Sequence, residues 1–145
     1  KKKHDSVFDY DFDHYQERFW GALGPDTASN FFHDFKEDIR LMKEAGLKSL
    51  RTSIQWTRLI DDFEKNTVNE QGLAFYNAVI DECLAQGIRP MLNLNHFDLP
   101  MELMERYGGW ESRHVVDLYA KFASVCFQAV YWRSGKQCVR YGRCI

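Results

Sequence analysis

The stretch MLNLNHFDLP, residues 91–100, places polar side chains directly after a short apolar run. For His96, two interpretations stay open: a core histidine bonded to a backbone carbonyl, or a functional group at the end of a strand. Asp98 fits a structural role better, because an aspartate in the turn before Pro100 can bond backbone amides. The roles of these residues depend on the helices and strands that position them.

A second charged residue, Arg51, lies inside the alternating stretch KSLRTSIQ, residues 48–55. A buried guanidinium needs carboxylate or carbonyl partners, because an unpaired buried charge is costly. Arg51 can therefore close an ion pair in the core, or it can point its charge at an active-site carboxylate. The residues alone do not choose between these roles.

Other candidate residues favour structural interpretations. Asn69-Glu70 follows a polar loop at a helix start, where a helix cap is the expected role. Trp56 and Trp110 can each serve as a sugar platform or as packing. We expect solvated faces for the glutamates at 102, 105 and 111. The sequence contains no metal-spaced His/Cys cluster and no G-x-S-x-G motif.

The elements that position these residues follow from hydrophobic periodicity. Spacings of three and four predict amphipathic helices over about 26–45, 70–86 and 112–127, with their inward positions at Phe32, Phe35, Ile39 and Met42, at Leu73, Tyr76, Ile80 and Cys83, and at Val115, Tyr119, Phe122 and Cys126. Strands are expected at 48–55 and 88–95, where Pro90 is tolerable only near a strand start. We expect loops over the first two dozen residues and over 61–67.

The order helix, strand, helix, strand, helix repeats visibly, since EAG-LKSLRTSI resembles AQG-IRPMLNL. Such alternation favours parallel βα units, and two α/β folds compete: a (β/α)8 barrel and an open doubly wound sheet. The open dinucleotide-binding sheet would want G-x-G-x-x-G, which the sequence lacks. We therefore favour the barrel, in which functional groups gather at the carboxyl ends of the strands.

Composition limits the classes of partner. The chain has 145 residues, 45% of them hydrophobic, which suits a single modest core, and its net charge of −2 with mixed signs argues against nucleic acid. No apolar run reaches membrane-spanning length and no signal peptide opens the chain, so we expect a cytoplasmic protein without membrane contact. The four cysteines at 83, 126, 138 and 144 form no Cys-x-x-Cys pair and suit buried thiols.

Three stretches resemble glycoside hydrolase family 1, the retaining β-glycosidases: HDFKEDIRLMKEAGLKSLRTSIQWTRL, NEQGLAFYNAVIDECLAQGIRPMLNLNHFDLP and YGGWESRHVVDLYAKFASVCF. Within the family, GPDTASNFF and RTSIQWTRL are most similar to the bacterial 6-phospho-β-glucosidases. The resemblance implies a barrel that hydrolyses a β-glucosidic bond with two glutamates, whose carboxyl groups lie about 5–5.5 Å apart in retaining enzymes. It implies neither a metal nor an organic cofactor.

The resemblance also assigns roles to individual residues. By position, Arg51 matches the family arginine that steadies the nucleophilic carboxylate. His96 matches the histidine that bonds hydroxyls of the sugar at the cleavage point. Phe97 stands where the family more often has tryptophan, so an aromatic wall remains without an indole donor. The implied partner is a small carbohydrate, a phosphorylated β-glucoside.

Several parts of the family pattern do not occur in these residues. The family's acid/base glutamate belongs to an Asn-Glu-Pro motif at the fourth strand, and none of the prolines, at 25, 90 and 100, follows Asn-Glu. The nucleophilic glutamate belongs near the seventh strand. We therefore expect a portion of a (β/α)8 TIM barrel, about strands two and three with flanking helices, without either catalytic glutamate.

This expectation divides the chain into a loop region at 1–25, a partial barrel domain at 26–128 and an anomalous tail at 129–145. We interpret the basic tail as the product of a frameshift near Ala129. An open part of a barrel exposes strand edges and apolar faces, so we expect self-association, and no hydrolysis by this chain alone.

Other functions stay open. The family also allows a plain β-glucosidase or a 6-phospho-β-galactosidase, which the later loops would distinguish. A third alternative is a non-catalytic remnant that binds a sugar or a complementing half-barrel.

Overall fold

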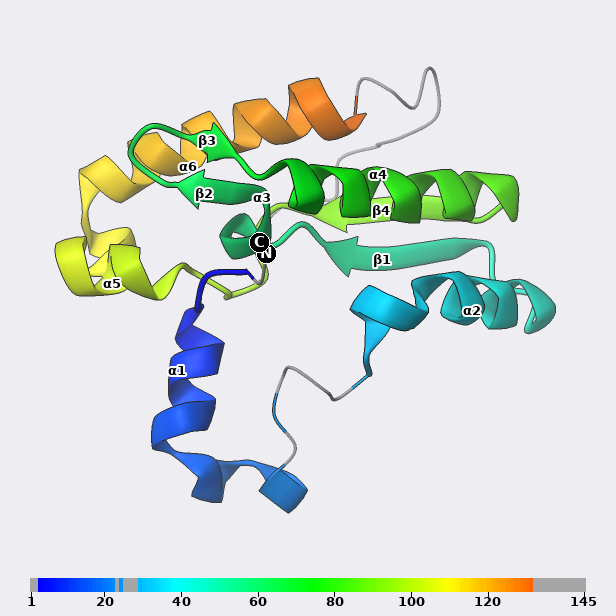
Figure 1. The fold of residues 1–145 in the computed structure, drawn as a ribbon, viewed down its shortest axis with the longest axis horizontal. Coiled ribbons are helices and arrows are strands. Elements are labelled where there is room, and N and C mark those ends of the chain that lie inside the picture. The colour runs from blue at the N-terminus through cyan, green and yellow to red at the C-terminus, as the bar shows by residue number, and fades with distance from the viewer. Residues whose placement is uncertain (1–2, 23, 25–28, 132–145) are drawn as a thin grey trace.

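The computed structural model describes residues 3–22, 24 and 29–131, and a parallel pair of strands lies at its centre (Figure 1). Strand β1 (Ser49–Ser53) pairs with β4 (Arg89–Asn93), in a register that joins Ser49 to Arg89 and Ser53 to Asn93. Parallel neighbours need a crossover, and helix α4 (Glu70–Ala85) supplies it. The predicted strands and their βα order are confirmed.

Helices α2 (Phe31–Glu44) and α4 cover one side of this sheet (Figure 1). Their contact is apolar because the spacing of three and four brings one face of each helix inward. The buried cluster here consists of Phe35, Ile39, Val79, Cys83 and Ile88. The predicted inward positions Phe35, Ile39 and Cys83 are therefore confirmed, whereas Phe32 is 41% exposed.

A second, larger core lies beyond the carboxyl ends of the strands. It joins α3 (Trp56–Leu59), α5 (Met101–Tyr107) and α6 (Arg113–Val125), with the 3-10 turn η3 (Gly109–Glu111) between α5 and α6 and the π-helical turn η4 (Cys126–Tyr131) after α6. Trp56 stacks on Phe122 with ring centroids 5.2 Å apart, and Leu103 and Val115 are fully buried. This core fixes both connections that leave the strands.

The expected loop at 61–67 is wrong in part. Strands β2 (Ile60–Asp62) and β3 (Thr67–Val68) form a short antiparallel hairpin there. The side chain of Phe63 in its turn is 2% exposed and packs edge-on against Trp56 at 6.0 Å. The strands are too short to show a period of two, so burial of one aromatic side chain, rather than local pattern, holds the hairpin in place.

The expected loop over residues 1–25 is also wrong in part. Helix α1 spans Val7–His14, followed by the 3-10 turns η1 (Gln16–Arg18) and η2 (Trp20–Ala22). The Ser6 backbone N–H and hydroxyl both donate to the Asp9 carboxylate, at 2.8 and 2.6 Å, which caps the helix. No residue of α1 is buried, so the sequence shows no helical period there.

The remaining boundaries differ slightly from expectation. Helix α2, expected from about residue 26, has Asn30 as its N-cap, and residues 25–28 lie outside the described part of the chain. Residues 129–131, the start of the expected anomalous tail, belong to η4, whereas 132–145 lie outside the described part of the chain. Cys83 and Cys126 are buried, as expected.

Candidate functional site

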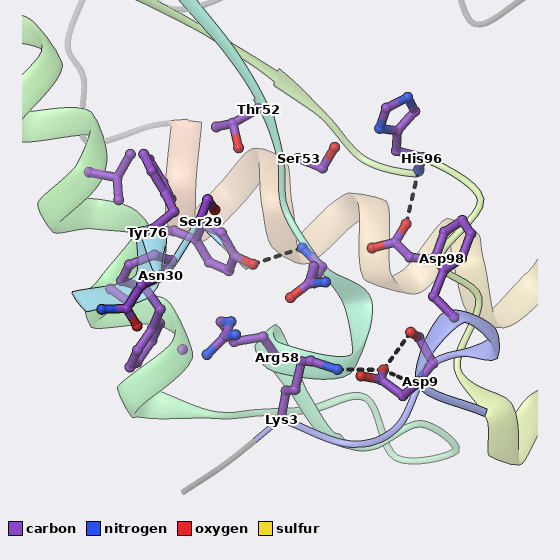
Figure 2. A pocket seen from close by; sticks show the side chains of 18 of the residues that line it. Lys3, Asp9, Ser29, Asn30, Thr52, Ser53, Arg58, Tyr76, His96 and Asp98 are labelled. Atoms are coloured by element: carbon purple, nitrogen blue, oxygen red, sulfur yellow. Dashed lines mark hydrogen bonds and ion pairs between the residues drawn. The ribbon is translucent and has the colours of Figure 1, made fainter. Parts of the chain in front are cut away.

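A cavity of about 1250 Å³ opens beside the carboxyl ends of β1 and β4. Figure 2 shows Thr52 and Ser53 from β1 and His96 and Asp98 from the segment after β4 around it. Its walls also include α1, the start of α2 and the start of α4. The cavity therefore lies where a βα architecture gathers functional groups.

The segment after β4 presents two side chains to solvent and buries a third. His96 is exposed and Phe97 is 74% exposed, whereas Asp98 is 8% exposed. The His96 backbone N–H donates to Asp98 Oδ1 at 3.0 Å, and the His96 ring is directed away from that carboxylate (Figure 2). The structural role predicted for Asp98 is confirmed, and His96 is not a core histidine.

Phe97 adopts a backbone φ of 70°, in the left-handed region. This conformation is sterically unfavourable for a bulky residue, because its Cβ approaches the following carbonyl oxygen. Strained backbone persists where surrounding contacts determine it, and such positions cluster at binding sites. Here the turn held by Asp98 fixes the backbone, and its result is an aromatic ring held in solvent at the strand end.

Arg51 lines the same cavity as His96, but it is exposed. The expectation of a buried guanidinium is wrong, because Arg51 lies on the sheet face that α2 and α4 do not cover. Its Nε lies 3.4 Å from Oδ1 of Asn93, and it forms no salt bridge to any residue within the described ranges. Its charge is therefore available to a group that enters the cavity.

The structure favours structural roles for the two tryptophans and for Asn69. Trp56 is 4% exposed inside the core, and Trp110 contacts Trp56 rather than the cavity. Asn69 caps α4: its Oδ1 accepts from the Gly72 N–H at 2.7 Å, and its Nδ2 donates to Asp61 at 2.8 Å. The glutamates at 102, 105 and 111 are exposed, as expected.

Several cavity residues were not identified from the sequence. The Arg58 guanidinium lies over the rings of Phe32 and Phe75, at 4.3 and 5.5 Å from their centroids. The Tyr76 hydroxyl accepts from the Gln55 N–H at 2.8 Å. These contacts join α3, α2 and α4, which are distant in sequence, so no local pattern could have predicted them.

The carboxylates that line the cavity are engaged in structural bonds. Burial acts to raise the pKa of Asp9, but hydrogen bonds from Lys3 and Ser6 outweigh it and hold that pKa below its ordinary value. Asp98 bonds the His96 backbone. Burial raises the pKa of the Tyr76 phenol, which keeps it protonated. Among the described residues, no three His, Cys, Asp or Glu side chains are grouped to hold a metal ion.

Comparison with known proteins identifies the family. The Glycosyl hydrolase family 1 sequence model matches residues 2–134. The chain is 46% identical over 126 residues to the 6-phospho-beta-glucosidase GmuD of Bacillus subtilis, covering 87% of this chain and 27% of that protein. It is also 46% identical over 110 residues to the 6-phospho-beta-glucosidase AscB of Escherichia coli, covering 72% of this chain and 23% of that protein.

Comparison with solved structures indicates the same family. The psychrophilic beta-glucosidase BglU of Micrococcus antarcticus superposes with a TM-score of 0.81 at 37% identity, covering 90% of this chain and 27% of that one. The rice Os3BGlu6 beta-glucosidase gives a TM-score of 0.77 at 35% identity, covering 88% and 26%. The chain belongs to glycoside hydrolase family 1. It spans about a quarter of the length of these relatives, as a portion of their TIM barrel.

Proposed function

We propose that the chain forms part of a 6-phospho-β-glucosidase, which hydrolyses the β-glucosidic bond of phosphorylated glucosides. The observation that carries this proposal is that exposed His96, at the carboxyl end of β4, lines one cavity with Arg51, while the ring of the next residue, Phe97, is also exposed. GmuD and AscB, two of its relatives, are bacterial proteins named as 6-phospho-beta-glucosidases. Similarity to a 6-phospho-beta-galactosidase of Clostridium acetobutylicum, at 42% identity, keeps that specificity as the second candidate.

In this proposal, each residue has a separate role. The His96 imidazole bonds hydroxyls of the sugar at the cleavage point, and the exposed Phe97 ring covers its apolar face. The exposed Arg51 guanidinium faces the nucleophilic carboxylate. A positive charge close to a carboxylate favours its ionised form, which is the reactive form of a nucleophile.

We further propose that the 145-residue chain alone does not hydrolyse glucosides. Retaining cleavage needs two carboxyl groups about 5–5.5 Å apart, flanking the bond. Among the described residues, the carboxylates that line the cavity are Asp9 and Asp98, and each is held in a structural bond. The pair that performs the chemistry would belong to other parts of the barrel.

Two assays test these proposals separately. The purified chain is incubated with an aryl 6-phospho-β-glucoside, and we expect no release of the aryl group; turnover that survives repurification would contradict the proposed inactivity. Sugar binding is measured by titration with glucose 6-phosphate and, in parallel, with galactose 6-phosphate and glucose. Preference for glucose 6-phosphate supports the leading specificity, and tighter binding of galactose 6-phosphate would replace it with the second candidate.

We propose that the chain alone self-associates. Trp20 is 99% and Phe97 is 74% exposed, and Arg51 and Met91, which pair across β1 and β4, are exposed too. Exposed aromatic side chains and open strand edges promote association between copies. Sedimentation velocity at increasing concentration should show growing assemblies; a monomer at all concentrations would refute this.

We also propose a cytoplasmic location. No helix of the described residues has the length and apolar character to cross a membrane. Cys83 and Cys126 are buried, and their burial is compatible with a reducing compartment. Fractionation of cells that express the chain, followed by immunodetection, tests this location.

A further inference from the structure

A cluster of polar side chains outside the cavity surrounds the carboxylate of Glu64, in the turn of the β2–β3 hairpin. The Tyr107 hydroxyl donates to Glu64 Oε1 at 2.5 Å. His114 Nε2 lies 3.1 and 3.0 Å from Oε1 and Oε2, and Arg106 Nη2 lies 3.9 Å from Oε1. One carboxylate thus contacts the end of α5 and the start of α6. None of the four residues lines the cavity.

The donors of this cluster are held by one another. The Tyr107 and His114 rings meet edge to face, with centroids 4.9 Å apart, and the Arg106 guanidinium lies 5.1 Å from the Tyr107 ring centroid. The hairpin is anchored on both sides of Glu64, since Phe63 is buried and Asn66 Nδ2 donates to the Lys121 carbonyl at 3.3 Å. The carboxylate is therefore presented in a defined direction.

The cluster joins two connections that start at neighbouring strands. The hairpin belongs to the connection from β1 to α4, residues 54–69, which brings Gln55 and Arg58 to the cavity. Helix α5 belongs to the connection from β4 to α6, residues 94–112, which carries His96 and Phe97. The hairpin, α5 and α6 lie at the same end of the molecule (Figure 1).

We propose that Glu64 is a positioning residue that ties these two strand-end connections together, and that the tie loosens when the Glu64 carboxylate is protonated. Protonation removes the negative charge that attracts Arg106 and turns one acceptor oxygen into a donor. The neutral carboxyl group is also a weaker acceptor for the Tyr107 hydroxyl and the His114 ring, because charge-assisted hydrogen bonds are the stronger ones. The proposal does not depend on the sugar specificity, because it concerns the geometry of the connections.

The charges around Glu64 set the direction of the pH response. The hydrogen bond from Tyr107, with smaller contributions from His114 and Arg106, lowers the pKa of Glu64 below its ordinary value. Because the folded pKa lies below the unfolded one, the contribution of Glu64 is complete above the ordinary glutamate pKa. It is lost as the pH falls through the lower, folded pKa.

Other charged groups near the cluster are paired. Glu102 accepts from Arg106 at 2.7 Å, and on the hairpin itself Lys65 pairs with Asp62 at 3.2 Å. These pairs also weaken in acid, so a pH series on the wild type alone would not isolate Glu64. A variant that removes the Glu64 charge separates its contribution from theirs.

The test is hydrogen–deuterium exchange of the whole chain, with rates corrected for the intrinsic effect of pH. At about pH 7, Glu64→Gln should accelerate exchange in the hairpin and α5 by roughly two- to fivefold. The control is Glu105→Gln, at an exposed glutamate of α5 that is not one of the four residues of the Glu64 cluster. It should leave these rates unchanged. Equal rates in wild type and Glu64→Gln would overturn the proposal.

The pH dependence provides a second, independent readout. Acid should accelerate exchange in these segments of the wild type more than in Glu64→Gln, which has already lost the carboxylate. In Tyr107→Phe, the donor that lowers the Glu64 pKa most is gone, so loosening should begin at a higher pH than in wild type. An identical acid response in wild type and Glu64→Gln would show that other groups carry it.

Discussion

The connections that leave β1 and β4 begin at equivalent positions of a repeated βα unit, yet they differ in the solvent exposure of the residues near their start. After β1, Ile54 is 0%, Trp56 is 4% and Thr57 is 1% exposed. After β4, His96 is exposed and Phe97 is 74% exposed. The residues directly after β1 are part of the core, whereas the connection after β4 presents His96 and Phe97 to solvent before it returns to the core.

This difference shows that a position at the carboxyl end of a strand does not by itself make a residue functional. Trp56 and Phe97 are both aromatic and both follow strands, but the Trp56 ring stacks on Phe122, whereas Phe97 is held outward by a φ of 70°. The exposure of Phe97 despite its strained backbone is the feature on which we propose that the second connection is the binding side.

The largest loss of stability should come from removing the buried aromatic ring that follows β1. Trp56→Ala deletes a buried ring and leaves a cavity, so the free energy of unfolding should fall by about 3–5 kcal/mol. Urea unfolding followed by far-UV circular dichroism measures it. Trp110→Ala, at a partly exposed ring, serves as the control, with a much smaller loss. Equal losses for the two would break the distinction between them.

A smaller loss should follow from uncapping α4, which completes the connection from β1. Asn69→Ala removes the acceptor of the Gly72 N–H and the donor to Asp61, and should lower stability by about 1–2 kcal/mol. Asn69→Asp keeps the cap acceptor but loses the donor to Asp61 and places a second carboxylate beside it, so it should recover only part of the loss. No loss in the alanine variant would contradict the capping role.

A pair of substitutions at Phe97 separates strain from function. Phe97→Gly removes the aromatic ring and suits a φ of 70°, whereas Phe97→Ala removes the ring but keeps the steric cost. The glycine variant should be more stable than the alanine variant by about 1 kcal/mol, while both should bind glucose 6-phosphate more weakly than wild type. Equal stability of the two variants would refute the strain.

The smallest effect on stability is expected at His96. His96→Ala removes an exposed ring that makes no side-chain hydrogen bond among the described residues, so the free energy of unfolding should change by less than about 0.5 kcal/mol. Asp98→Ala, which releases the His96 backbone N–H, should cost more. A large loss in His96→Ala would mean that this histidine has a structural role instead.

The parts of the fold that the sequence predicted are those with a strong local period. Helix α4 and strands β1 and β4 were expected because their apolar positions recur at 3.6 or two residues. Helix α1 was missed because none of its residues is buried, and the β2–β3 hairpin because it is held by Phe63 rather than by its own pattern.

The site was predicted in part for a similar reason. The place of His96 after an apolar run identified the strand end, and the turn chemistry of Asp98 was correct. The exposure of Arg51 could not be read from its strand, because it depends on which sheet face the helices cover. Arg58 and Tyr76 reach the cavity through contacts between distant helices, which local sequence does not encode.

The central claim is that the carboxyl end of β4 is the sugar-binding side of this chain. The most direct test is an NMR titration of the isotopically labelled 145-residue chain with glucose 6-phosphate, beside the same titration of His96→Ala. The account predicts saturable shifts at Arg51, His96 and Phe97 in the wild type, and much weaker binding in the variant. Shifts confined to other residues, or equal affinity in the variant, would contradict it.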